Sequence, residues 1–293
     1  PMPPRSRAAA AGMVGREVPA RPAEGRTFVV LLDSPSTARA GGGASYDLLV
    51  RRVARQFVEQ SVSPSDEAAI VHVQGASRDS QGFTRSRELL YESIDRYGRG
   101  LSGASGSIGL TGQEQISRHL DTYRVLQDVA ERLDALTGRR RGIVWIGAQL
   151  RFAPPDCGPF DLSCLAFRNA FPAMLAAHRD AMGVANRHNV TVYPVDPAGL
   201  TTDLGPGELD RRAALQAVAD DTGGLAVVGT NDFAAGFRAI VRDHSTYYLL
   251  GYVPAVEHRD SAFHRIDVRI KRGGLTVRAR KGYLATGPAV RPD

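Results

Sequence analysis

The stretch TFVVLLDSPST, residues 27–37, joins an apolar run to an abrupt polar turn and predicts a buried strand that ends at a carboxylate. Residues 27–32 lack the polar alternation of a half-exposed strand, so both faces should be covered, as in the centre of a parallel sheet. In open α/β sheets the functional crevice lies beyond the carboxyl ends of such strands. Asp33, at that end, is therefore the first candidate for a site.

Hydroxyl groups follow Asp33 closely, at Ser34, Ser36 and Thr37. Such oxygens can complete a hard-cation site beside a carboxylate. The alternative is an Asx or Ser turn that only caps the following helix. The stretch alone leaves both interpretations open.

The following segments alternate between helical and strand-like patterns. Apolar residues at three- and four-residue spacing predict helices at about 46–59, 86–97, 111–133, 165–186, 208–221 and 233–243. Short apolar runs predict strands at 68–73, 143–146, 190–195 and 225–228, with a short extended piece at 82–84. Thr111 and Glu114 form a T-x-x-E capping box at the start of the long third helix. This order predicts an α/β fold with a parallel sheet.

After residue 246 the pattern changes to strand-like alternation. Strands are predicted at 247–253, 263–271 and 275–280. Gly273-Gly274 fits a two-residue hairpin turn, which would pair Ile270 with Val277 on an apolar face and Asp267 with Arg280 on a charged face. The prediction is a small antiparallel β extension packed on one side.

Composition limits the remaining classes of function. The net charge is 37 minus 31, or +6, and the Pro-, Ala- and Arg-rich residues 1–26 supply five Arg against two Glu, so the folded part is only mildly basic. We interpret residues 1–26 as a disordered basic tail. The cationic hairpin face at Arg269, Arg278, Arg280 and Lys281 suggests a nucleic-acid strip, but a solvated face is the preferred interpretation. No run of eighteen apolar residues occurs, so no membrane span is predicted.

Cys157 and Cys164 lie in a Pro- and Gly-containing segment, PPDCGPFDLSC. Their spacing suits a local disulfide, with two free thiols as the alternative. A disulfide would point to an oxidising compartment.

Local signatures of common enzymes are missing from the sequence. There is no G-x-S-x-G elbow and no H-E-x-x-H, and the seven histidines are scattered. His72, in the second predicted strand, is interpreted as a buried residue with a satisfied hydrogen bond rather than a base. The prediction is that the protein is not an enzyme.

Several phrases, in order, resemble the von Willebrand factor A (vWA)-like domains, and more closely a bacterial vWA-related group. They are FVVLLDSPST, DEAAIVHV, VTVYPVD, ADDTGG, HSTYYLLGYVP, FHRIDVRI and VRARKGYLA, and they span about residues 27–285. The resemblance implies a Rossmann-like vWA fold, a central mainly parallel sheet flanked by helices, with a C-terminal antiparallel β hairpin. The implied division is a vWA-like domain at 27–245, a β extension at 246–285 and a tail at 286–293.

In vWA domains a metal-ion-dependent adhesion site holds Mg²⁺ through D-x-S-x-S, a Thr in a later loop and an Asp after the fourth strand. Here Asp33 fits the first carboxylate, Pro35 replaces the first Ser, Thr37 replaces the second, and Thr111 is the candidate for the loop Thr. Gly147 and Ala148 follow the IVWI strand, so the second carboxylate is missing. A Mg²⁺ site usually needs one or two carboxylates, so the resemblance implies a degenerate metal site.

The sequence therefore predicts a non-enzymatic protein-binding module, with Asp33, Ser34, Ser36, Thr37 and Thr111 as binding residues and no cofactor. The alternative is a Mg²⁺-dependent adhesion module, in which a partner's carboxylate completes a shell on Asp33, Thr37 and Thr111. Nucleic-acid binding and an uncharacterised enzyme rank below both. A secreted or periplasmic location is expected from the cysteine pair and the resemblance.

Overall fold

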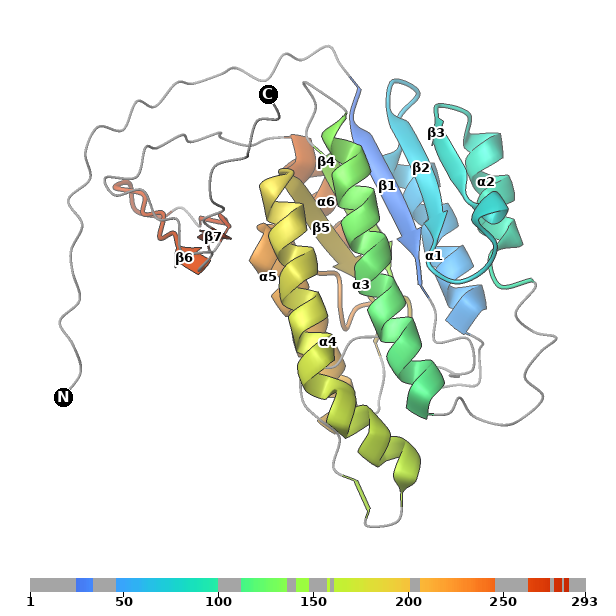
Figure 1. Ribbon diagram of the computed structural model, residues 1–293. Helices are drawn as coiled ribbons and strands as arrows, with labels where there is room; N and C mark the ends of the chain where they lie inside the picture. The colour runs from blue at the N-terminus through green and yellow to red at the C-terminus, as the bar shows by residue number, and fades with distance from the viewer. Residues whose placement is uncertain are drawn as a thin grey trace, which may run out of the picture.

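The computed structural model describes residues 25–33, 46–99, 112–135, 141–147, 157–158, 161–200, 206–245, 263–274, 277–280 and 282–284. Within them a five-stranded sheet lies between two layers of helices (Figure 1). The strands are β1 (Thr27–Leu32), β2 (Glu67–His72), β3 (Gln81–Thr84), β4 (Arg141–Ile146) and β5 (Val190–Val195). Their order is β3-β2-β1-β4-β5, and only β3 runs antiparallel to its neighbour. The predicted α/β fold with a mainly parallel sheet is confirmed.

Strand β1 is the centre of the sheet, as its apolar run predicts. It pairs in parallel with β2 on one side and β4 on the other over all of its residues, and every one of them is buried. Phe28, Val30 and Leu32 belong to one core, whereas Val29 and Leu31 belong to the core on the opposite face. Alternate side chains of one strand therefore hold both helix layers.

The helices are α1 (Tyr46–Ser61), α2 (Arg87–Arg96), α3 (Gly112–Asp134), α4 (Leu162–Arg187), α5 (Pro206–Thr222) and α6 (Phe233–Ser245), with a 3₁₀ turn η1 at Ser77–Asp79. Side chains of α1, α2 and α6 pack in one core, and side chains of α3, α4 and α5 pack in the other. All six predicted helices are present. Helix α4 begins three residues earlier than predicted, because Asp161 caps it by accepting a hydrogen bond from the Cys164 N–H at 2.9 Å.

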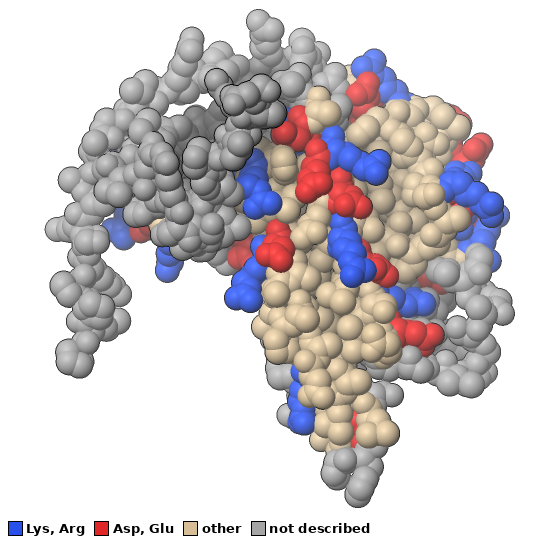
Figure 2. Space-filling model, viewed as in Figure 1, with Lys and Arg blue, Asp and Glu red and all other residues tan. Residues whose placement is uncertain are grey.

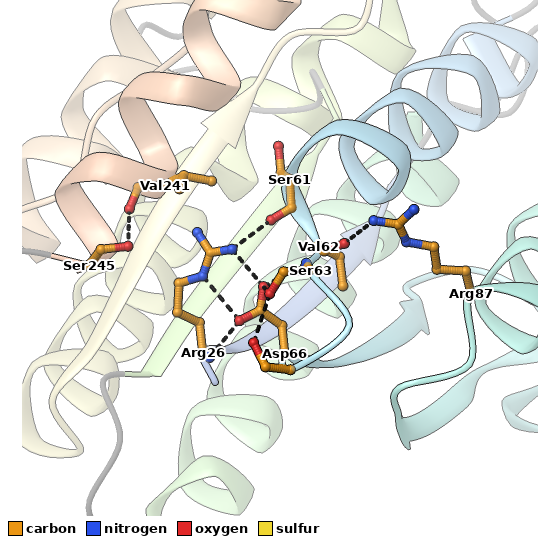
Figure 3. A network of polar contacts seen from close by, with 9 residues as sticks. Arg26, Ser61, Val62, Ser63, Asp66, Arg87, Val241 and Ser245 are labelled. Carbon is orange, nitrogen blue, oxygen red and sulfur yellow. Dashed lines mark hydrogen bonds and ion pairs between the residues drawn. The ribbon is translucent and has the colours of Figure 1, made fainter. Parts of the chain in front are cut away.

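A network of polar contacts at the start of β1 and β2 fixes the amino edge of the sheet (Figure 3). Asp66 accepts hydrogen bonds from the Arg26 backbone and guanidinium, and from the Ser63 N–H and hydroxyl, at 2.6–3.1 Å. Arg26 also donates to the Ser61 carbonyl at 3.0 Å. The Asp66 side chain is 2% exposed, so this ion pair joins the entries to two neighbouring strands inside the protein.

Helices α3 and α4 extend past the carboxyl ends of the central strands (Figure 1). A small separate core, formed by Ile116 from α3 with Phe167, Phe171 and Met174 from α4, holds this pair together. We call the part of α3 and α4 around this core the projection. Its surface in Figure 2 carries few charged side chains compared with the upper part of the same helices. Leu162, at the start of α4, is 78% exposed.

The C-terminal region differs from its prediction. The structure shows a two-stranded antiparallel sheet, β6 (Phe263–Arg265) with β7 (Gly282–Leu284), while residues 266–274 and 277–280 are not in strands. The predicted hairpin at Gly273-Gly274 is therefore not shown, and Ile270, expected on a packed face, is 46% exposed.

The charged residues of this region have other partners than those that the predicted hairpin would give them. Arg278 donates to Asp243 at 2.6 Å and Arg280 donates to the Asn186 carbonyl at 2.8 Å, so both bind the helical body. Asp267 pairs with Arg269 at 2.8 Å and not with Arg280 across a strand. Contacts with α4 and α6 have replaced the expected cross-strand pairs.

Three other expectations have clear outcomes. The predicted strand 225–228 is reduced to a single bridge between Val227 and Val195. Cys157 and Cys164 form the expected disulfide. No helix among the described residues has the length and apolarity needed to cross a membrane. The predicted strand 247–253, the tail 286–293 and residues 1–24 lie outside the described residues.

Candidate functional site

The sheet topology directs attention to the ends of β1 and β4. From β1 the chain proceeds to β2 on one side of the sheet, and β4 joins on the other side. The strand order therefore reverses between β1 and β4, and in open α/β sheets ligands bind outside the carboxyl ends at this position. Asp33 and Gly147 are the first residues beyond these two strands, and the Asp33 N–H bonds to the Ile146 carbonyl at 3.0 Å.

Asp33 is completely buried and both of its carboxylate oxygens accept hydrogen bonds. Oδ1 accepts from the Gln74 amide at 2.7 Å. Oδ2 accepts from the Thr122 hydroxyl at 3.1 Å and from the Trp145 indole at 3.2 Å. All three donors are neutral, and they come from the end of β2, from α3 and from β4. Asp33 therefore joins three elements around the end of β1.

Burial makes the charged form of Asp33 less favourable than it would be in water. Burial raises the pKa of Asp33 above its ordinary value, although the three hydrogen bonds and the nearby Arg118 cation act in the opposite direction. The neighbouring Tyr123 on α3 has a raised pKa as well, because of its burial first and the Asp33 charge second. Burial at this site therefore favours the uncharged forms of both side chains.

Gly147, the first residue after β4, has no room for a side chain. A Cβ atom at this position would lie 2.9 Å from the Asp33 Cβ, the Asp33 carbonyl oxygen and the Trp145 Nε1. Real Cβ atoms do not approach backbone and ring atoms so closely. The close packing of β4 on Asp33 thus requires glycine and excludes an acidic side chain at residue 147.

Arg118 lies one helical turn before Thr122 on α3, nearer the carboxyl edge of the sheet. Its positive charge acts on Asp33, but Asp33 accepts no hydrogen bond from it. The Arg118 side chain is half-buried, and its Nη1 is fully covered without a hydrogen-bond partner among the described residues. This guanidinium is the cationic group whose charge acts most on Asp33.

A second buried carboxylate, Asp196, follows β5 at the same edge. Its Oδ1 accepts from the Ala198 N–H at 3.0 Å, and its Oδ2 lies 3.2 Å from Arg211 Nη2. Arg211 also contacts Glu208 and the Tyr46 hydroxyl. Burial raises the pKa of Asp196, and the Arg211 cation opposes that rise. Asp196 therefore ties β5 to α5 and, through Arg211, to the start of α1.

The other predicted site residues, Ser34, Ser36, Thr37 and Thr111, lie outside the described residues, so their places around Asp33 stay predictions. Within the described ranges no group of three or more His, Cys, Asp or Glu side chains could hold a metal ion. His72 is buried, with Nε2 3.1 Å from the Ser93 carbonyl, and burial lowers its pKa to about 4. It is the neutral, hydrogen-bonded residue that the sequence predicted.

Three residues of the site, Gln74, Thr122 and Trp145, did not emerge from the sequence as site residues. Gln74 carried a usable signal, because it lies just beyond the predicted strand 68–73, whose carboxyl end should meet that of β1. Thr122 carried one too, since it is a polar residue one helical turn before Leu126, in line with the apolar stripe of α3. Trp145 was recognised only as part of a buried strand.

Comparisons with known proteins give distant structural similarity alone. No protein family and no curated protein matches the sequence. The pilus adhesin SpaC of Lactobacillus rhamnosus GG, in its open conformation, is similar with a TM-score of 0.42 and 10% identity over 80% of this chain. This chain spans 31% of the length of that adhesin chain. An uncharacterized membrane spanning protein from Vibrio fischeri is similar with a TM-score of 0.20 and 16% identity, over 73% of this chain and 95% of that one.

Proposed function

We propose that this chain is a non-enzymatic protein-binding module of vWA type, which binds its partner through the carboxyl edge of the sheet without a metal ion on Asp33. The observation that carries the proposal is the closed hydrogen-bond shell of Asp33. Both oxygens already accept from the neutral donors Gln74, Thr122 and Trp145, and the carboxylate has no exposed surface. A Mg²⁺ ion needs carboxylate oxygens that are free to coordinate it.

The arrangement of the carboxyl edge supports protein binding. The projection extends beyond this edge and carries few charged side chains on the face in Figure 2. Leu162 at its end is 78% exposed and offers a partner an apolar side chain there. The disulfide between Cys157 and Cys164 borders the same end and fits an extracellular role. A secreted or periplasmic location is part of the proposal.

Calorimetric titration with Mg²⁺ and Mn²⁺ tests the metal-free part of the proposal. We expect no heat of binding, for the wild-type protein or for Asp33→Asn. Asparagine is the suitable replacement, because it has the same shape and keeps one acceptor for the surrounding donors. Saturable heat that Asp33→Asn abolishes would instead establish the Mg²⁺-dependent adhesion module, completed by a carboxylate of the partner.

Capture of extracellular proteins on the immobilised domain tests the binding role. We expect the same partner to be retained in EDTA and in Mg²⁺, and to be lost from Leu162→Ser. The matched control is Ile270→Ser, which replaces another exposed apolar residue, 46% exposed, in the C-terminal region. No retained protein under either condition, or equal retention by both variants, would count against a binding surface at the carboxyl edge.

A further inference from the structure

The inference concerns the unused hydrogen-bonding capacity of Arg118. Its Nη1 atom is covered and makes no hydrogen bond to any residue that the structure describes. Leaving such a donor unpaired in the interior costs roughly 1–3 kcal/mol, and more for a charged group. The neighbouring carboxylate does not satisfy it, because Asp33 accepts from three other donors.

The position of Arg118 matches the end of the sheet where a ligand is expected. Arg118 lies on α3 one helical turn before Thr122, the residue that donates to Asp33. It is therefore beside the strand-order reversal between β1 and β4, on the side facing the carboxyl edge. Because the side chain is half-buried, its guanidinium can turn toward a ligand without losing any hydrogen bond of Nη1 within the described structure.

We propose that Arg118 binds a carboxylate of the partner directly, as a planar two-hydrogen-bond pair at the carboxyl edge beside Asp33. The inference rests on the proposed protein-binding function and names the chemistry that the partner offers. A guanidinium presents parallel N–H donors whose spacing matches a carboxylate, and such pairs are strong and directional. The single positive charge of one guanidinium suits a single negative charge, and the unpaired Nη1 supplies one of the two donors. The carboxylate comes from an Asp or Glu side chain or from a chain end.

Two small probes separate these sources in a titration followed by nuclear magnetic resonance. N-acetyl-aspartate amide offers a side-chain carboxylate, N-acetyl-alanine offers a terminal carboxylate, and sodium chloride of equal ionic strength is the blank. The signal is the Arg118 Nε–H resonance, assigned by its loss in Arg118→Gln, together with backbone amides of α3. The matched control is Arg124→Gln, because Arg124 is on the same helix but 70% exposed and already paired with Asp121 at 3.0 Å.

We expect a saturable shift with at least one carboxylate for the wild-type protein and Arg124→Gln, and at least tenfold weaker binding for Arg118→Gln. The probe that saturates identifies the source of the carboxylate. Failure of both probes to shift the wild-type signals, or equal binding by Arg118→Gln, would overturn the inference. Partner capture that persists in that case would leave the proposed function standing, so the two failures are distinguishable.

Thermal unfolding separates a ligand-binding Arg118 from a structural one. Arg118→Gln and Arg118→Met should melt at or above the wild-type temperature, because each removes a buried donor that has no partner. A melting temperature that falls in both variants would assign Arg118 to the stability of the fold and contradict the inference.

Discussion

At the residue scale, Asp33 shows how a buried carboxylate can be kept without a buried cation bonded to it. Gln74, Thr122 and Trp145 donate to it from three different elements. Removing the carboxylate while leaving these donors in place would take the acceptor from the buried Trp145 indole and from the half-buried Gln74 amide, and would leave the Thr122 hydroxyl only the Arg118 carbonyl, at 3.0 Å. Asp33 thus acts as the acceptor around which the end of β1 is assembled, and that role explains its presence without reference to a metal.

The pH dependence of stability tests this role. The folded state raises the pKa of Asp33, so the folded protein holds a proton that the unfolded chain has lost in the pH range between the two values. The contribution of Asp33 to the free energy of unfolding therefore increases as pH falls through that range and decreases as pH rises. Asp33→Asn has no such proton. The difference in unfolding free energy, wild type minus Asp33→Asn, should grow in favour of the wild type between pH 7 and pH 4 in urea titrations.

Asp33→Asn should remain well folded, because the Gln74 amide can turn and offer its oxygen to the new NH₂ group. Asp33→Leu has no acceptor and should lose roughly 3 kcal/mol or more. A pH-independent difference between the wild-type protein and Asp33→Asn would mean that Asp33 titrates alike in both states. A folded and equally stable Asp33→Leu would refute the role of Asp33 as the shared acceptor.

Gly147 supports a second prediction at this scale. Gly147→Ala should destabilise the protein by about 2 kcal/mol, because the new methyl group would lie 2.9 Å from Asp33 and Trp145 atoms. Gly82→Ala is the matched control, since a Cβ there has nothing within 4 Å. Chemical denaturation of both variants measures the comparison. Equal stability of the two variants would show that β4 can move away from Asp33 at little cost.

The sequence could predict the acceptor of this site but not its donors. Asp33 follows a run of six apolar or β-branched residues and is therefore placed by local pattern alone. Gln74, Thr122 and Trp145 are 41, 89 and 112 residues away along the chain, so their meeting depends on strand order and helix rotation. Thr111, placed at the site by analogy with vWA loops, lies outside the described residues, while Thr122 makes the contact that the structure shows.

At the scale of elements, the Arg26–Asp66 pair holds the entries of β1 and β2 together. Burial alone would raise the pKa of Asp66, but the hydrogen bonds from Arg26 and Ser63 outweigh burial and keep that pKa below its ordinary value. The stabilisation is therefore complete above the unfolded-state pKa of Asp66 and disappears as pH falls below about 4. Its pH dependence is opposite in sign to that of Asp33.

Asp66→Asn should cost roughly 3 kcal/mol at pH 7, because it breaks a buried ion pair and leaves Arg26 without its carboxylate. The comparison variant is Asp95→Asn, which breaks the exposed Arg55–Asp95 pair and should cost less than about 1 kcal/mol. Urea unfolding at pH 7 and pH 3 measures both. A penalty for Asp66→Asn that persists undiminished at pH 3 would mean that the charge of Asp66 does not provide the stabilisation.

Strands and helices with strong periodic patterns were predictable, whereas the C-terminal strands were only partly so. The observed pairing of Phe263 with Leu284 continues, outward along both strands, the register predicted for Ile270 with Val277. Among the described residues nearer the predicted turn, 266–274 and 277–280 are not in strands, and Arg278 and Arg280 bond instead to Asp243 and Asn186 on the helical body. Local alternation cannot anticipate such competition from distant helices.

At the scale of the whole molecule, the projection and the sheet are separate units of packing. The cores on the two faces of the sheet share β1, whereas the core of the projection contains only residues of α3 and α4. Pro172 lies inside α4 and has no N–H, so the helix lacks one backbone hydrogen bond there, toward its start. The disulfide between Cys157 and Cys164 and the Asp161 cap fasten this same end. Because its core is small and separate from those of the sheet, the projection should open at lower free energy than the sheet, even with this end fastened.

Reduction of the disulfide is expected to loosen the projection alone. A ring of this size contributes at most about 2.5 kcal/mol by restricting the unfolded chain. The variant Cys157→Ser/Cys164→Ser should show faster amide hydrogen exchange in residues 162–171 and at the start of α3, with β1 and β4 unchanged. Phe171→Ala, which empties the small core without touching the disulfide, should accelerate exchange in the same residues. Equal acceleration in β1 and β4 would mean that the projection and the sheet unfold as one unit, and that a partner bound at the projection would be felt throughout the protein.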